Sequence, residues 1–260
     1  MTITHDRHAQ DPLSMSDAER TTRVDLAAAY RLAAMFGWDD LIFTHMTARI
    51  PDTEHLLINP YGLLFDEIKA SNLVKIDLAG RILDDTAHDI NPAGLTIHSA
   101  VHEAREDVQC VIHLHTTEGV AVGAQTHGVL PISQHSIFVL SSIAYHDYEG
   151  VALREDEKQR LTSNFADNTY LMLRNHGLLT VGRSVADAWQ AMYFFQKSCA
   201  IQVAATGSSA DGADHLTMID QSIIDTAAEQ AKTVTRGERA NLVWPSLLRR
   251  VERLDPTFAS

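Results

Sequence analysis

Two histidines separated by one residue, His113 and His115, have the residue type and spacing to do chemistry. They lie in the stretch VIHLHT, whose β-branched and apolar residues are typical of a strand. Because strand residues two apart point to the same face, the two imidazole rings should converge, as ligands of a divalent metal would. The alternative, which is the commoner origin of an isolated His-x-His pair, is one hydrogen-bonded core histidine and one that faces solvent.

A third histidine strengthens the prediction of a metal site. His176 lies between Asn175 and Gly177, where an apolar strand reaches a turn that frees the backbone to direct the ring. Three imidazoles leave coordination positions open, and a catalytic metal site requires such positions whereas a structural site does not. Zinc is the ion we expect, although iron, manganese and cobalt also suit three imidazoles.

Composition limits the other possibilities. A chain of 260 residues with 45% hydrophobic residues can bury the core of one large domain, or of one domain with helical extensions. The formal net charge of -13, from 34 acidic and 21 basic residues, would repel phosphate backbones and anionic lipid surfaces. We therefore expect no nucleic-acid partner and no membrane partner. The 14 histidines supply neutral metal ligands instead.

Neither a membrane span nor an export signal is expected. No window of the sequence reaches the roughly 18 apolar residues that cross a bilayer, and the N-terminal segment is polar throughout. The expected location is the cytoplasm. Cys110 and Cys199 lie in apolar or helical sequence, so we interpret them as buried thiols and not as a disulfide.

The order of helical and strand-like periods predicts an α/β fold with a mixed or antiparallel sheet and helices on its faces. We divide the chain into a mobile N-terminal arm (1–16), a metal-binding domain (17–206) and a C-terminal part (207–260). This last part should form a linker, one helix and a tail that packs on the domain or on a neighbouring subunit. Residues 62–68 and 130–133 are both expected to be strands, from their apolar runs.

Several stretches of this sequence resemble the class II aldolase and adducin family, closest to its adducin-like bacterial branch. They are THMTARIPDTEHLLINPYGLLFDEI, INPAGLTIHSAVHEAREDVQCVIHLHT, LPISQHSIFVLSSIAYHDYEG and LRNHGLLTVGRSVADAW. The resemblance implies α/β/α layers, with a largely antiparallel central sheet of about nine strands flanked by helices. It also implies a homotetramer with active sites near subunit interfaces, and a divalent metal, usually zinc, on His113, His115 and His176.

Two departures from the family pattern bear on the substrate. The family's sugar-phosphate aldolases carry Ser-Ser-Glu, which binds phosphate and exchanges protons, just after the proline at the position of Pro92. This sequence has Ala93-Gly94-Leu95 there, and Thr44-His45 replaces a Gly-Asn turn that also contacts phosphate. The usual sugar-phosphate aldolase reaction is therefore not expected.

Other groups would have to exchange the proton. His135 falls close to the position of an active-site tyrosine in the aldolases, and we take it, with Glu118 and Tyr145, as the candidate catalytic residues. Glu118 is alternatively an acid in the first turn of a helix, facing the helix dipole. Four further histidines lie on segments that could approach the metal: His45, His98, His102 and His146. His98 and His102 are four apart on one helix and so share a face, and a packed or solvated pair is the simpler interpretation of these two.

Three functions follow from these expectations. The first is a divalent-metal-dependent lyase that performs retro-aldol cleavage or decarboxylation of a small carbonyl or carboxylate substrate through a metal-stabilised enolate. The second is a non-haem iron oxygenase on the same three histidines, since a few proteins resembling this family have that activity. The third is a non-catalytic scaffold, as in the head domain of the animal adducins, whose heads usually lack the full histidine set.

Overall fold

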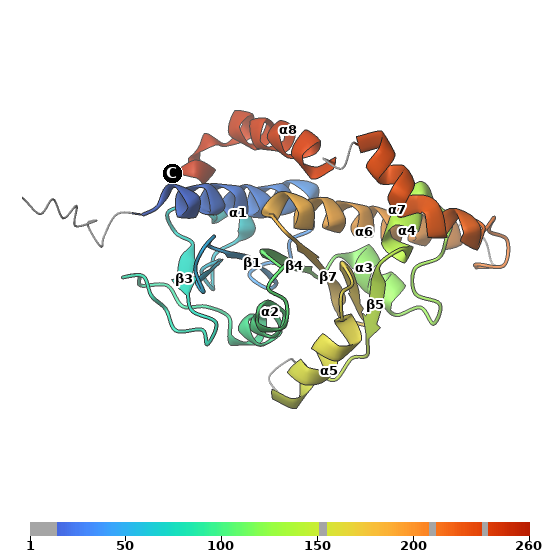
Figure 1. Ribbon diagram of the computed structural model, residues 1–260, viewed down its shortest axis with the longest axis horizontal. Helices are drawn as coiled ribbons and strands as arrows, with labels where there is room; N and C mark the ends of the chain where they lie inside the picture. Colours follow the sequence, from blue (N-terminus) through green and yellow to red (C-terminus); the bar gives the residue numbers. More distant parts are fainter. Residues whose placement is uncertain (1–14, 151–154, 208–211, 236–238) are drawn as a thin grey trace, which may run out of the picture.

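The computed structural model describes residues 15–150, 155–207, 212–235 and 239–260. Its centre is a sheet of seven strands in the order β3-β2-β1-β4-β7-β6-β5 (Figure 1). Every neighbouring pair is antiparallel except β5 and β6, which are parallel. The strands are β1 (His45–Arg49), β2 (Leu56–Ile58), β3 (Val74–Ile76), β4 (Cys110–Leu114), β5 (Ile143–His146), β6 (Tyr170–Leu173) and β7 (Gly177–Gly182).

Helices cover both faces of this sheet, which gives the expected α/β/α layers (Figure 1). One face carries α1 (Asp17–Phe36) and α6 (Val185–Thr206), and α8 (Arg239–Leu254) lies outside α1. The other face carries α2 (Pro92–Ala104) and α5 (Glu155–Phe165). Of the remaining helices, α3 (Thr117–Gly123) and α4 (Gln134–Leu140) pack against α6, and α7 (Gln221–Thr235) packs against α4.

The prediction of about nine strands is wrong for the described residues, and residues 62–68 are one reason. They contain a single 3-10 turn, η1 (Phe65–Glu67), instead of a strand. The guanidinium of Arg31 donates hydrogen bonds to the backbone carbonyls of Asp66 and Ile68, and Phe65 is fully buried against α1. A side chain therefore occupies the backbone acceptors that a neighbouring strand would need.

Residues 130–133 do not form the expected strand either, because side chains occupy the backbone N–H donors of this segment. The backbone N–H of Leu130 donates to the Gln202 side chain, and that of Ile132 donates to the Ser136 hydroxyl. Pro131 between them has no N–H to offer. The backbone hydrogen bonds of this segment are thus used locally, and the chain turns directly into α4.

The C-terminal part forms two helices, α7 and α8, and a final 3-10 turn, η2 (Pro256–Ala259), instead of the single helix expected. It packs on its own chain: the Trp244 indole donates to Asp25 of α1 at 2.9 Å, and Phe258 is buried. Most of the predicted mobile arm, residues 1–14, lies outside the described residues. None of the helices in the described ranges is long and apolar enough to cross a lipid bilayer.

The register of the central strands brings three distant segments together. β4 pairs with β1 on one side, where His113 lies opposite His45, and with β7 on the other, where Leu114 lies opposite Leu178. The end of β4, the beginning of β1 and the turn that enters β7 therefore meet at the same end of these central strands. The predicted ligands lie there.

Candidate metal centre

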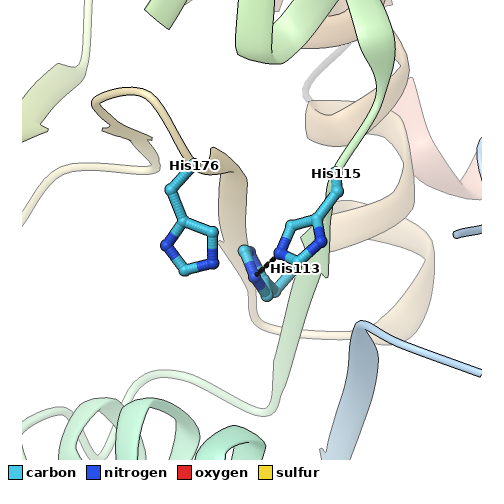
Figure 2. A group of neighbouring side chains, drawn as sticks. All are labelled: His113, His115 and His176. Carbon is cyan, nitrogen blue, oxygen red and sulfur yellow. Dashed lines mark hydrogen bonds between the residues drawn. The ribbon is translucent and has the colours of Figure 1, made fainter. Parts of the chain in front are cut away.

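The three predicted ligands meet in space (Figure 2). His113 belongs to β4, His115 follows the last residue of that strand, and His176 lies in the turn between β6 and β7. One ring nitrogen from each histidine lies within 4.8 Å of the others. His113 is buried, whereas His115 and His176 are half-buried, so one side of the cluster is open to a ligand.

Hydrogen bonds fix which nitrogen of His113 and His115 is free to bind a metal. Nδ1 of His113 lies 3.0 Å from the Leu178 carbonyl oxygen, and Nδ1 of His115 lies 3.0 Å from the Asp40 carboxylate. Both oxygens are acceptors, so in the neutral rings both Nδ1 atoms carry the proton and both Nε2 atoms present a lone pair. These partners are typical of the outer shell of histidine metal sites.

The two Nε2 atoms are 3.0 Å apart. Where both rings carry their proton on Nδ1, no hydrogen bond can form between these two nitrogens, and a cation between them would satisfy both lone pairs (Figure 2). Two imidazoles on a tetrahedral metal, at metal–nitrogen distances of about 2.0–2.1 Å, would have nitrogens about 3.3 Å apart. The spacing and the tautomers therefore both fit a bound divalent ion.

Burial keeps His113 and His176 neutral, as a metal requires. It holds the pKa of His113 well below the ordinary value, and the neighbouring His176 and His115 act in the same direction. Burial also lowers the pKa of His176 to about 4, assisted by His115. At neutral pH the rings of His113 and His176 need lose no proton before they bind a cation.

The turn that carries His176 depends on its two flanking residues. Asn175 has a φ of 58°, a left-handed conformation that asparagine adopts more readily than most residues. A Cβ on Gly177 would lie 2.5 Å from the Leu114 carbonyl oxygen and 3.0 Å from the His115 ring. Only glycine at this position lets β7 approach the end of β4 closely enough to place His176 beside the other two rings.

A cavity of about 480 Å³ opens beside the histidines, which is large enough for a small metabolite. Its described lining includes the three histidines, and no lysine or arginine belongs to that part of the wall. Tyr148 also lines it, with its ring 6.1 Å from that of His176. The other described lining residues are Asp40, Phe43, Thr44, His45, Tyr61, Asn91, Ile97 and Gly150.

The three candidate catalytic residues lie elsewhere in the chain, and none of them lines this cavity. Glu118 is in the first turn of α3, where its carboxylate accepts a hydrogen bond from Gln196 of α6 at 2.7 Å. The ring of His135 on α4 packs 5.7 Å from that of Phe194. The Tyr145 hydroxyl accepts from the backbone N–H of Val129. Their catalytic role stays a prediction, and it would require that a neighbouring subunit bring them to the cavity.

Two residues of the site escaped the reasoning from sequence. Asp40 orients His115 from a segment far away in the chain, and no motif marks it. Tyr148 lies two residues beyond the end of β5, and its position at the cavity depends on how the chain leaves that strand. The weak signal for Tyr148 is an aromatic residue just beyond the end of a strand, whereas no sequence signal marks Asp40, which lies between α1 and β1.

The hydrogen bond between Asp40 and His115 makes a sharp prediction. Replacing Asp40 by asparagine keeps the shape but removes the charge that holds the His115 tautomer, so zinc affinity should fall about 10- to 100-fold. Competition with a chromophoric chelator measures this. Asp39→Asn, which makes the same charge change at an exposed neighbour, is the control. Equal affinities for both variants would contradict the role of Asp40.

Comparison with known proteins identifies the family. The sequence model of the Class II Aldolase and Adducin N-terminal domain matches residues 24–203. A Pseudomonas aeruginosa protein that is provisionally named an aldolase class 2 protein is 50% identical over 99% of both chains. Mouse alpha-adducin is 43% identical over 85% of this chain, which corresponds to 30% of the adducin. The chain belongs to the class II aldolase and adducin family.

Solved structures agree with this assignment. The crystal structure of an aldolase II superfamily protein from Pseudomonas syringae has a TM-score of 0.89 and 48% identity, covering 95% of this chain and 98% of the other. L-fuculose 1-phosphate aldolase from Glaciozyma antarctica has a TM-score of 0.79 and 26% identity, covering 95% of this chain and 96% of the other. The fold is therefore the layered α/β fold of this superfamily.

Proposed function

We propose that this protein is a divalent-metal-dependent lyase that acts on a small carbonyl or carboxylate substrate by retro-aldol cleavage or decarboxylation. One observation carries the proposal: three imidazoles converge in the wall of a cavity of about 480 Å³. Family membership supports it, since a relative with the same fold is named as an L-fuculose 1-phosphate aldolase.

A divalent ion held by His113, His115 and His176 would supply Lewis acidity, because both reactions leave negative charge on a carbonyl oxygen. The protein's part is to hold the rings rigidly. The Leu178 carbonyl and the Asp40 carboxylate fix two of them, and the close approach at Gly177 places the third. Zinc is the ion we propose, with iron, manganese and cobalt as alternatives.

The reaction also needs a proton acceptor and a donor. In retro-aldol cleavage the substrate hydroxyl loses its proton and becomes the carbonyl of the released aldehyde. The carbon–carbon bond breaks, and the electron pair of that bond passes to the other carbonyl group, which becomes an enolate. The carbon atom next to this carbonyl then takes up a proton. We propose Tyr148, which lines the cavity beside His176, for one of these transfers. His135, Glu118 and Tyr145 would serve only if a neighbouring subunit contributes them.

A homotetramer in the cytoplasm completes the proposal. The homotetramer rests on the family resemblance, and the cytoplasmic location on the absence of a long apolar stretch in the sequence; within the described residues no helix could span a membrane. Sedimentation velocity of the purified protein would test the assembly.

A substrate screen tests the function. Protein loaded separately with zinc, manganese and cobalt is assayed against 2-oxo acids, β-hydroxy acids and aromatic hydroxy acids, with carbon dioxide or aldehyde release as the readout. We expect turnover that a chelator abolishes and metal restores. Anaerobically prepared ferrous protein is assayed in parallel, and oxygen uptake coupled to product in the absence of lyase turnover would overturn the lyase in favour of the oxygenase.

A scaffold is the second candidate, and the 43% identity with mouse alpha-adducin favours it. The complete histidine cluster with its ordered partners argues for the enzyme instead. A metal-free protein with unchanged assembly and unfolding midpoint, and no turnover when reloaded, would favour the scaffold.

A further inference from the structure

The same cavity contains buried polar atoms that the metal site does not use. Thr44 is 3% exposed and His45 is 5% exposed, and both line the cavity. Neither the Thr44 hydroxyl nor either ring nitrogen of His45 has a hydrogen-bond partner among the described residues. Buried polar groups in folded proteins are almost always hydrogen-bonded, so three such atoms on one wall indicate a ligand that supplies the partners.

The backbone is strained where these groups enter the cavity. Thr44 has a φ of 66°, in the left-handed region that a β-branched residue rarely adopts. Strain of this kind persists where the surrounding structure holds it, and it concentrates at binding sites. Here it places two consecutive side chains, the hydroxyl of Thr44 and the imidazole of His45, on the cavity wall at the beginning of β1.

The His45 ring is held from two sides. A Cβ on Gly94, in the first turn of α2, would lie 2.6 Å from the ring, so the helix packs directly against it. The His98 ring lies on another side, with centroids 4.3 Å apart. His98 is itself fixed by the hydroxyl of Thr47, which contacts both His98 and His102 at 2.8 Å. His45 is therefore a preorganised group and not a mobile one.

The described wall of the cavity is neutral apart from one acid. It has no lysine or arginine to pair with a phosphate or a second carboxylate, and Asp40 would repel either. A neutral imidazole offers one donor and one acceptor, and a hydroxyl offers both. This set matches the hydroxyl groups of a substrate.

We propose that Thr44 and His45 form a subsite for the uncharged, hydroxylated end of the substrate, whose carbonyl or carboxylate end lies at the three histidines. The substrate class is then unphosphorylated hydroxy-carbonyl or hydroxy-acid compounds. This inference rests on the proposed function, because it takes the histidine cluster as the place where the reacting end binds.

Three hydroxamates that differ only at the far end test the proposal: propionohydroxamate, glycerohydroxamate and 3-phosphoglycerohydroxamate. Each is titrated into zinc-loaded protein by calorimetry, without turnover. We expect glycerohydroxamate to bind at least about 10-fold tighter than propionohydroxamate, which corresponds to one or two good hydrogen bonds. The phosphorylated compound should bind no tighter than glycerohydroxamate.

Variants assign the preference to the two residues. Thr44→Gly keeps the left-handed backbone and removes the hydroxyl, and His45→Phe keeps a ring and removes both nitrogens. Each should reduce the preference for glycerohydroxamate by about 3-fold or more, while zinc content and propionohydroxamate affinity stay unchanged. His127→Phe, at an exposed histidine, should change neither affinity. Because Thr44→Gly relieves strain, it provides a folded variant even if His45→Phe does not fold.

The outcomes separate the subsite from the proposed function. Equal binding of all three hydroxamates, or a preference that both variants retain, would overturn the subsite and leave the metal centre standing. Tighter binding of the phosphorylated compound would show an anion site and overturn the proposed substrate class. Failure of zinc-loaded protein to bind any of the three would overturn the metal-centred function and the subsite with it.

Discussion

Replacing His113 by alanine is expected to remove stoichiometric metal from the protein and, with it, all metal-dependent turnover. His113 is the buried ligand, 2% exposed, and its Nε2 lies 3.0 Å from that of His115. Its loss leaves two ligands on separate segments, so the zinc affinity should fall by more than the 10- to 100-fold typical of losing an outer-shell partner. Chelator competition and metal analysis after gel filtration measure the change.

His127→Ala provides the control, because it removes an exposed imidazole from the same chain. The His113 variant also deletes a buried ring, so circular dichroism must show a folded protein before its metal content is interpreted. Retention of one zinc per chain at undiminished affinity in folded His113→Ala protein would contradict the assignment of this residue as a ligand.

The metal-free protein is expected to lose stability steeply as the pH falls from about 6.5 to 4. Burial lowers the pKa of His45 and of His102 to about 3, and it holds the pKa of His98 and of His113 well below the ordinary value. The unfolded chain, with histidine pKa values near 6.5, binds more protons than the folded chain in this window. Folding free energy is therefore fully present above about pH 6.5 and is lost on acidification.

The size of this effect follows from proton linkage. Each imidazole that takes up its proton only on unfolding contributes about 1.4 kcal/mol per pH unit, so four would give about 5 kcal/mol per pH unit below pH 6. Urea unfolding at several pH values measures the slope. His102→Gln, which can still bond to Thr47, should reduce the slope by about 1.4 kcal/mol per pH unit, whereas His127→Gln should leave it unchanged. Equal slopes for wild type and His102→Gln would contradict the buried, neutral state of His102.

The sequence carried the information for the cluster of three histidines because local geometry determines most of it. Alternation along β4 places His113 and His115 on one side, and the Asn175–Gly177 turn marks His176. The bounds of α1 could also be predicted from periodicity and capping, because the helix begins after Ser16 and ends just before Gly37, which has a φ of 67°. These features depend on residues close together in the chain.

The remaining features depend on contacts between distant residues, and sequence reasoning did not reach them. Arg31 and Gln202 use side chains to occupy the backbone groups of segments that were expected to be strands. Asp40 reaches His115 across a long separation in the chain. His98 and His102 were recognised as a pair on one helix face, but their shared partner Thr47 lies on β1, a different element. No periodicity records such contacts.

Contacts between distant residues also explain why the cavity contains none of the three predicted catalytic residues, His135, Glu118 and Tyr145. Position along the chain predicted them, whereas the described cavity wall presents Tyr148 instead. Whether a residue faces a site depends on the path of its whole segment, as the turn from β5 to Tyr148 illustrates. Within one chain, the residues that line the cavity are therefore better candidates for proton transfer than residues chosen by their position in the sequence.

Anomalous diffraction from crystals of the purified protein, recorded at the zinc, iron, cobalt and manganese edges, tests the central claim most directly. The account predicts a single ion per chain, bound by Nε2 of His113, Nε2 of His115 and one ring nitrogen of His176 at about 2.0–2.1 Å, with at least one position open to the cavity. Crystals soaked in each of these metals that show no ion between the three rings, or an ion that excludes His176, would contradict it.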